Sequence, residues 1–286
     1  MDELRQSRIQ DVLKQQRIGA WLGWRPDEIL LMTGYYPQWG VSLCLYPRAG
    51  SPILFNPALE PDDRLPAGLD VRQYGWGVSA DPWAELVAAL RAALRERGLQ
   101  DEPVTFRQAA SQSSPCGNSA EEPPLPTKLP QLLENVSPAG WVDAEPALLG
   151  LYLTKTPPEV ERIRLAHQVA QVGIQAFYEH LIPGNTEAAV AAAVESAIQN
   201  QMAARADVQY ARGWAFVQSG PNAVYGGTYS RTTGRRLAAG ELVMIELGVC
   251  VNGYWADITR TGATSGAALN PIHQDIFDAV KTPQAA

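Results

Sequence analysis

The pattern of apolar positions predicts alternating helices and strands in the N-terminal half of the chain. Residues 2–16 and 81–99 place apolar side chains at helical spacing among charged residues. A short helical segment over residues 28–34 ends at Gly34. Apolar runs typical of buried strands lie at residues 20–24, 42–46 and 52–55, and a last strand is expected at 141–143. We therefore expect an α/β domain over residues 1–150, with a mixed sheet and flanking helices.

One segment interrupts this pattern. Residues 107–130 are rich in Ser, Gln, Gly, Glu and Pro and carry few apolar side chains. Such a composition buries too little apolar surface to offset its ordering entropy. We expect a loop or a disordered insert here.

A second unit is expected over residues 151–286. Thr156, Pro157 and Glu159 combine an N-cap, a proline at the first helical position and a capping-box glutamate. An apolar stripe then continues to about residue 180, and an Ala-rich helix follows over residues 186–204. Strand patterns follow at 214–218 and 241–248, and a final helix starts at Pro271.

The most informative stretch is the predicted hairpin formed by residues 243–251 and 254–261. The dipeptide Asn252-Gly253 between them favours a two-residue turn with positive φ at both positions. Counting outward from this turn pairs Val251 with Tyr254 and Gly248 with Asp257.

Two acids meet on one face of this hairpin. Glu246 is two residues from Gly248, so Glu246 and Asp257 are diagonal neighbours whose backbones lie about 7–8 Å apart. Like charges repel at this distance, and a shared metal ion would explain the pair. The alternative is two ordinary surface carboxylates, and spacing alone does not decide between them.

Composition narrows the classes of function. The net charge of −7 and the lack of a Lys/Arg cluster argue against a nucleic-acid partner. The sequence contains no apolar run of 18 residues, the length that a membrane-spanning helix requires. The N-terminus lacks the apolar core of a signal peptide. The three cysteines lack metal-ligand spacing and predict no disulfide framework. We expect a cytoplasmic protein.

The chain resembles the pita-bread metallopeptidases of the Xaa-Pro aminopeptidase and prolidase type. The resemblance rests on the hairpin from Glu241 to Thr261, on the helix start at residues 152–166, and on the segments Ile182–Glu187 and Ser219–Asn222. Residues 8–35 resemble the creatinase/prolidase N-terminal domain. This family implies a partial α+β pita-bread domain over residues 151–286, metal ligands at Glu246 and Asp257, a divalent metal (Mn, Co or Zn), proline-containing peptides as substrates and a homodimer.

Three departures from the family pattern bear on activity. The leading ligand is Glu246 where the family usually has Asp. No histidine follows Ser219–Asn222, where Tyr225 and Tyr229 stand in the stretch that usually supplies one. The family's other ligands, one His and two Glu, come from a later half of the domain than this sequence contains. We therefore expect a truncated or divergent member. Half of a pita-bread domain would leave the inner face of the hairpin uncovered as an exposed apolar patch, unless a dimer partner or another polypeptide covers it.

The remaining candidate residues are expected to be structural. His167 and His180 fall on the long helix and at its end, where His180 would cap the helix dipole. His273 is expected to face solvent, and Arg260 to lie on the face opposite Asp257.

The sequence thus favours a Xaa-Pro peptidase lineage with weak or no activity. Two alternatives stay open: a non-catalytic peptide- or protein-binding protein, and a metal-independent creatinase-like amidinohydrolase. The catalytic and substrate-binding residues are left unassigned.

Overall fold

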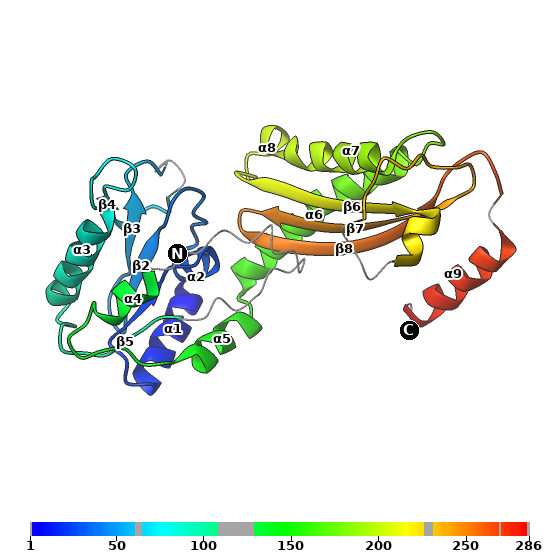
Figure 1. Ribbon diagram of the computed structural model, residues 1–286. Helices are drawn as coiled ribbons and strands as arrows, with labels where there is room; N and C mark the ends of the chain where they lie inside the picture. The colour runs from blue at the N-terminus through cyan, green and yellow to red at the C-terminus, as the bar shows by residue number, and fades with distance from the viewer. Residues whose placement is uncertain (1, 61–64, 108–128, 226–230, 269, 285–286) are drawn as a thin grey trace. The chain divides into compact units, whose positions relative to one another are not determined.

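The computed structural model divides into two compact units, residues 1–160 and 161–286 (Figure 1). It describes residues 2–60, 65–107, 129–225, 231–268 and 270–284, with the side chains of 129, 130, 225, 283 and 284 left out. The two units are described separately below.

The first unit is built on a five-stranded mixed sheet of order β4-β3-β2-β1-β5. Its strands are β1 (Ala20–Gly23), β2 (Leu43–Pro47), β3 (Ile53–Pro57), β4 (Asp70–Tyr74) and β5 (Val104–Thr105). The pairs β1/β2 and β2/β3 are antiparallel, whereas β3/β4 and β1/β5 are parallel. The predicted mixed sheet is therefore confirmed.

Helices flank this sheet through two apolar clusters. They are α1 (Glu3–Gln15), α2 (Pro26–Thr33), α3 (Pro82–Glu96), α4 (Leu129–Glu134) and α5 (Glu145–Leu153). Leu86, Leu90 and Leu94 of α3 pack into one cluster, and Ile9 and Leu13 of α1 into the other. The Gly34 end of α2 has φ +79°, the left-handed conformation that glycine adopts at low cost.

The sequence missed β4 and β5 and misplaced the last strand of this unit. Trp141 forms only an isolated bridge to Val104, so the expected strand at 141–143 is wrong. The expected loop at 107–130 is described only at its ends. Arg107 is buried there and α4 begins at Leu129, whereas residues 108–128 lie outside the described part.

The second unit places helices against a three-stranded antiparallel sheet of order β6-β7-β8. Its strands are β6 (Ala211–Ser219), β7 (Leu242–Val251) and β8 (Tyr254–Ala263). Its helices are α6 (Pro157–Glu179), which begins at the end of the first unit, α7 (Glu187–Gln199), α8 (Gln201–Ala204), the 3₁₀ turn η2 (Gly220–Tyr225) and α9 (Pro271–Gln284). In Figure 1, α7 runs alongside β6 and α6 passes behind the strands.

One face of this sheet forms the core with α6 and α7. Val243, Ile245, Leu247, Val249 and Val251 of β7 are fully or almost fully buried in this cluster. Side chains of a strand alternate between faces, so the even-numbered residues of β7, which include Glu246, lie on the opposite face. We call this second face the open face.

The start of α6 carries a variant of the predicted capping box. The Thr156 amide donates to Glu159 Oε2 (2.8 Å), as expected, but the Thr156 hydroxyl donates to Asp2 instead of capping the helix. Glu159 also pairs with the buried Arg5 (2.5 Å). The capping glutamate thus ties α1 to the start of α6 within the first unit.

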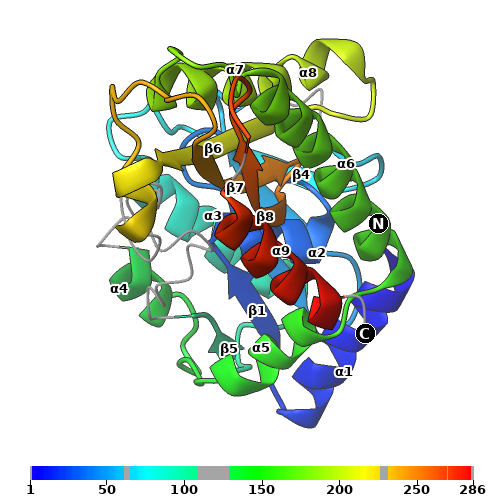
Figure 2. The same cartoon turned by 90° about the vertical axis from the view of Figure 1, so that its right-hand side faces the viewer.

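Two helix predictions were wrong in detail. The Ala-rich helix ends at Gln199, and α8 is a separate element. In α9, the apolar side is more than half exposed at each of its large residues, whereas His273, which was expected to face solvent, is the more buried side chain. Figure 2 turns the molecule by 90° and brings α9 to the front of the view.

Candidate metal centre

The hairpin that carries the acid pair forms as predicted. Asn252 has φ +49° and Gly253 φ +88°, the positive values that a tight turn between two strands requires. The side chain of Asn252 fixes the turn further. Its Oδ1 accepts from the amides of Gln209 and Tyr210 (2.9 and 3.0 Å), and its Nδ2 donates to the carbonyl of Asp207 (2.8 Å).

The register of β7 and β8 agrees with the count from this turn. Val251 lies opposite Tyr254, and Gly248 lies opposite Asp257. Thr259 lies opposite Glu246, so all three polar side chains share the open face. The register therefore brings together the two acids that the sequence singled out.

Glu246 and Asp257 are diagonal neighbours on the open face, because Asp257 lies opposite Gly248 and Glu246 lies two residues before Gly248. Partial burial raises the pKa of Glu246 above its ordinary value, and the hydrogen bond and negative charge of Asp257 raise it further. The Thr259 hydroxyl donates to Glu246 Oε2 and opposes this rise. A proton or a cation between two neighbouring carboxyls relieves the repulsion of their charges.

The donor chemistry of this pair suits a divalent cation in part. Carboxylate and hydroxyl oxygens are ligands for ions such as Mn²⁺, and carboxylates also bind Zn²⁺. Glu246 is half-buried and Asp257 is exposed, so the site is open to solvent. In the part of the chain that the structure describes, no group of three or more His, Cys, Asp and Glu side chains could hold a metal ion.

An aromatic pair borders the acids on the open face. Trp214 of β6 lies opposite Gly248, which in turn lies opposite Asp257. Its indole stacks on that of Trp255, with ring centroids 4.9 Å apart and planes 20° apart. Gly248, which lies between Trp214 and Asp257 in the register, carries no side chain.

A buried carboxylate fixes the segment that follows β6. Glu187, which has no exposed surface, accepts hydrogen bonds from the amide and hydroxyl of Ser219 (both 2.7 Å). Asn222 Nδ2 (3.0 Å to each carboxylate oxygen) and the amide (2.9 Å) and hydroxyl (2.7 Å) of Thr233 donate to it as well. Burial alone would raise the pKa of Glu187, but these donors lower it below its ordinary value.

The histidines lie elsewhere. His180 contacts the Ala176 carbonyl through Nδ1 (2.8 Å) at the end of α6, and this contact suits the predicted capping role. His167 is exposed on α6. Arg260 lies opposite Ile245 on the core side of the hairpin, as predicted, and donates to the Thr259 carbonyl (2.8 Å). The side chains of Tyr225 and Tyr229 lie outside the described residues.

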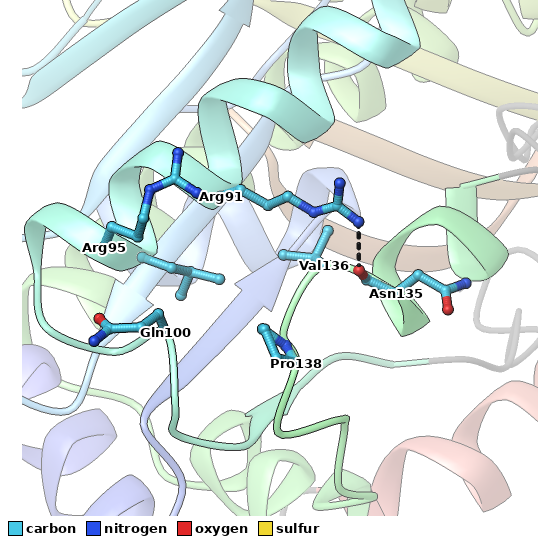
Figure 3. A pocket seen from close by; sticks show the side chains of 7 residues that line it. Arg91, Arg95, Gln100, Asn135, Val136 and Pro138 are labelled. Atoms are coloured by element: carbon cyan, nitrogen blue, oxygen red, sulfur yellow. Dashed lines mark hydrogen bonds between the residues drawn. The ribbon is translucent and has the colours of Figure 1, made fainter.

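A separate cavity of about 440 Å³ lies in the first unit (Figure 3). Leu94 and Val136 are among its lining residues, and Arg91 reaches across it to donate to the carbonyl of Asn135 (2.9 Å). The guanidinium of Arg95 points away from that of Arg91, so the two charges do not converge. Its lining includes no acid, histidine or cysteine and therefore makes no second metal centre.

The sequence of the second unit matches a family of metallopeptidases. Residues 161–286 match the profile of metallopeptidase family M24. The predicted resemblance to the pita-bread metallopeptidases is thereby confirmed.

The relatives share most of the chain's length at low identity. The Bacillus subtilis (strain 168) protein YkvY, whose name assigns it to the dipeptidases, is 23% identical over 282 residues, which are 95% of this chain and 70% of that protein. The Xaa-Pro dipeptidase of Lactobacillus delbrueckii subsp. lactis is 24% identical over 271 residues, 91% of this chain and 65% of its own length.

Solved structures show the same fold. The prolidase of Pyrococcus horikoshii OT3 superposes with a TM-score of 0.71 at 18% identity, over 99% of this chain and 70% of that one. The Xaa-Pro dipeptidase of Bacillus anthracis gives a TM-score of 0.67 at 16% identity, over 95% and 67%. The predicted succession of an α/β domain and a pita-bread-type α+β unit is therefore confirmed as a fold.

Sequence reasoning missed three parts of this site. Thr259 could have been found, because the same count that pairs Gly248 with Asp257 pairs Glu246 with Thr259. Trp214 could not be placed, because the register of β6 against β7 is set by no local turn. Glu187 looked like an ordinary residue of a helix start, and its partners come from segments distant in sequence.

No helix among the described residues is long and apolar enough to span a bilayer.

Proposed function

We propose that this chain is a Xaa-Pro dipeptidase-type metallohydrolase in which Glu246 and Asp257 hold a divalent cation (Mn, Co or Zn). The observation that carries the proposal is the position of the two acids as diagonal neighbours on the open face of the sheet, within the residues that match the M24 profile. Bound there, a cation would supply Lewis-acid polarisation of the peptide carbonyl that precedes proline.

The chain's own residues would orient this chemistry. Thr259 holds Glu246 through its hydroxyl, so the carboxylate has a fixed position on β7. Asp257 supplies the second oxygen ligand from β8, and its exposure leaves room for a peptide. Glu187 acts at a distance, because it fixes the Ser219–Asn222 segment at the end of β6.

The proposal includes weak or no peptidase activity for this 286-residue chain. Two carboxylates leave most ligand positions of a cation to water, and a weakly held ion polarises a carbonyl poorly. Incubation with Xaa-Pro dipeptides and tripeptides plus Mn²⁺, Co²⁺ or Zn²⁺ tests this. Slow or undetectable release of proline is expected, whereas robust turnover would refute the inactive form of the proposal.

The second candidate is a non-catalytic protein that binds peptides or proteins. It is favoured by the lack of a third ligand beside the acid pair among the described residues. Glu246→Ala with Asp257→Ala separates the two candidates. Loss of metal binding supports the peptidase type, and unchanged peptide binding supports the binding protein.

A metal-independent creatinase-like amidinohydrolase ranks last. Such an enzyme needs a catalytic histidine, and His180 and His167 lie on or at the end of α6, apart from the open face of the hairpin. Release of urea from creatine, in the presence of a chelator, would revive this candidate.

We also propose that the protein is cytoplasmic and that it forms a homodimer. The observation that supports the dimer is the exposed apolar side of α9, where Ile272, Ile276, Phe277 and Val280 are 53–63% exposed. Light scattering tests the dimer. Ile276→Ser with Phe277→Ser is expected to shift the mass toward the monomer, and Gln274→Ser on the same helix serves as the control.

A further inference from the structure

Trp214 and Trp255 form an aromatic surface directly beside the acid pair. Trp214, Gly248 and Asp257 occupy one row across the three strands, and Trp255 lies two residues before Asp257 on the same face. Residues i and i+2 of one strand point to the same face and lie about 7 Å apart. A group bound at the carboxylates therefore lies within reach of the indoles.

The stacked pair is both oriented and accessible. The two rings lie nearly parallel, 4.9 Å apart, which fixes each against the other. Both indoles are half-buried, so part of their surface remains available. A rigid aromatic surface binds an apolar group with little loss of conformational entropy.

The chemistry of this surface suits a saturated ring next to an amide nitrogen. The face of an indole is electron-rich and attracts the polarised C–H groups of such a ring. The pyrrolidine ring of proline is also rigid, so it loses little freedom when it is bound. Aromatic surfaces bind proline-containing segments for these reasons.

We propose that Trp214 and Trp255 together bind the proline ring of the substrate and set the preference for proline. This inference rests on the proposed function, since it assumes that the peptide binds at Glu246 and Asp257. It assigns to the two indoles the selection between prolyl and non-prolyl peptides, and to the acids the binding of the cation.

The test compares Gly-Pro with Gly-Ala, which differ in the ring. Isothermal titration calorimetry measures both dissociation constants with saturating Mn²⁺ and again without metal; where turnover occurs, kcat/KM replaces them. The variants are Trp214→Ala, Trp255→Ala and the conservative Trp214→Phe and Trp255→Phe. Trp83→Phe is the matched control, because Trp83 pairs with Trp76 (5.0 Å) in the first unit.

The wild type is expected to prefer Gly-Pro by about tenfold, equivalent to about 1.4 kcal/mol. The Ala variants should bring the ratio close to one, while the Phe variants keep most of the preference and Trp83→Phe keeps all of it. The affinity for Mn²⁺ should stay unchanged throughout. A purely structural role of the indoles would lower both affinities equally and leave the ratio unchanged.

Two results overturn the inference: no preference for Gly-Pro in the wild type, or an unchanged ratio in Ala variants with native circular dichroism. If an Ala variant fails to fold, Trp214→Leu and Trp255→Leu replace it, because leucine keeps apolar bulk without an aromatic face. Failure of the proposed function is distinguishable. It would show as absence of Mn²⁺ binding, whereas the Gly-Pro preference is still measured in metal-free buffer.

Discussion

Glu28 lies at the start of α2 with no exposed surface and accepts hydrogen bonds from the amides of Trp24 and Arg25 (3.0 and 3.1 Å). Burial, followed by the charge of Asp27, raises its pKa to about 7, although the two amides and Arg107 oppose the rise. The carboxyl is therefore stabilised as the neutral acid in the folded protein.

This pKa predicts a specific pH dependence of stability. The folded-state pKa is raised, so the contribution of Glu28 is fully present below about pH 4.5 and is lost as the pH rises through about 7. Each pKa unit corresponds to about 1.4 kcal/mol, so the loss amounts to about 3 kcal/mol at most. Urea unfolding of the wild type and Glu28→Gln between pH 5 and pH 8 should show the variant gaining relative stability. A constant difference across this range would contradict the prediction.

Glu187 shows the opposite behaviour. Its hydrogen-bond donors lower its pKa despite burial, so its stabilising contribution is present above about pH 4.5 and is lost at lower pH. Glu187→Ala removes the acceptor for Ser219, Asn222 and Thr233, and each donor left unpaired in the interior costs about 1–3 kcal/mol. We expect a loss of at least about 3 kcal/mol in the free energy of unfolding at pH 7.

Chemical unfolding at pH 7 measures this loss. Glu195→Ala is the matched control on the same helix, since Glu195 Oε1 accepts a single hydrogen bond, from the Ala215 amide (3.0 Å). If the two variants lose the same free energy of unfolding, the hydrogen bonds to Glu187 contribute no more to stability than the single one to Glu195.

At the scale of elements, the β7–β8 hairpin depends on its turn. Asn252 tolerates its positive φ and makes the hydrogen bonds to residues 207–210, so Asn252→Ala loses both contributions. We expect a cost of about 1–3 kcal/mol, measured by thermal unfolding. Asn252→Asp keeps the acceptor and the tolerance of positive φ, and should cost less. If Asn252→Ala leaves the stability unchanged, the register of β7 and β8 is fixed by pairing with β6 and not by the turn.

The hairpin also shows what the sequence can and cannot predict. Its turn and its alternation are local, so the pairing of Gly248 with Asp257 followed from counting. β4 and β5 contain few or no consecutive apolar residues, so no local sequence signal predicts these strands. Their pairings with β3 and β1 therefore could not be predicted. The exposure of the apolar side of α9 was also beyond the pattern, because periodicity identifies a face without identifying its partner.

At the scale of the whole molecule, the resemblance to the metallopeptidases implies a metal site with several ligands, and the described residues supply only two of them. Glu246 and Asp257 lie on one face of the hairpin, as predicted, but no larger group of metal-ligand side chains includes them in the described ranges. A cation bound by two carboxylates keeps most of its water, so we expect a dissociation constant of about 0.1–1 mM, as in weak oxygen-ligand sites.

Titration of Mn²⁺ by calorimetry tests the central claim most directly. The wild type should bind Mn²⁺ in this range, and Glu246→Gln combined with Asp257→Asn should abolish the binding while the protein stays folded. These substitutions keep the size of each side chain and remove only the charge. Undetectable binding to the wild type, or binding that survives in the double variant, would contradict the assignment of the acid pair as a cation site.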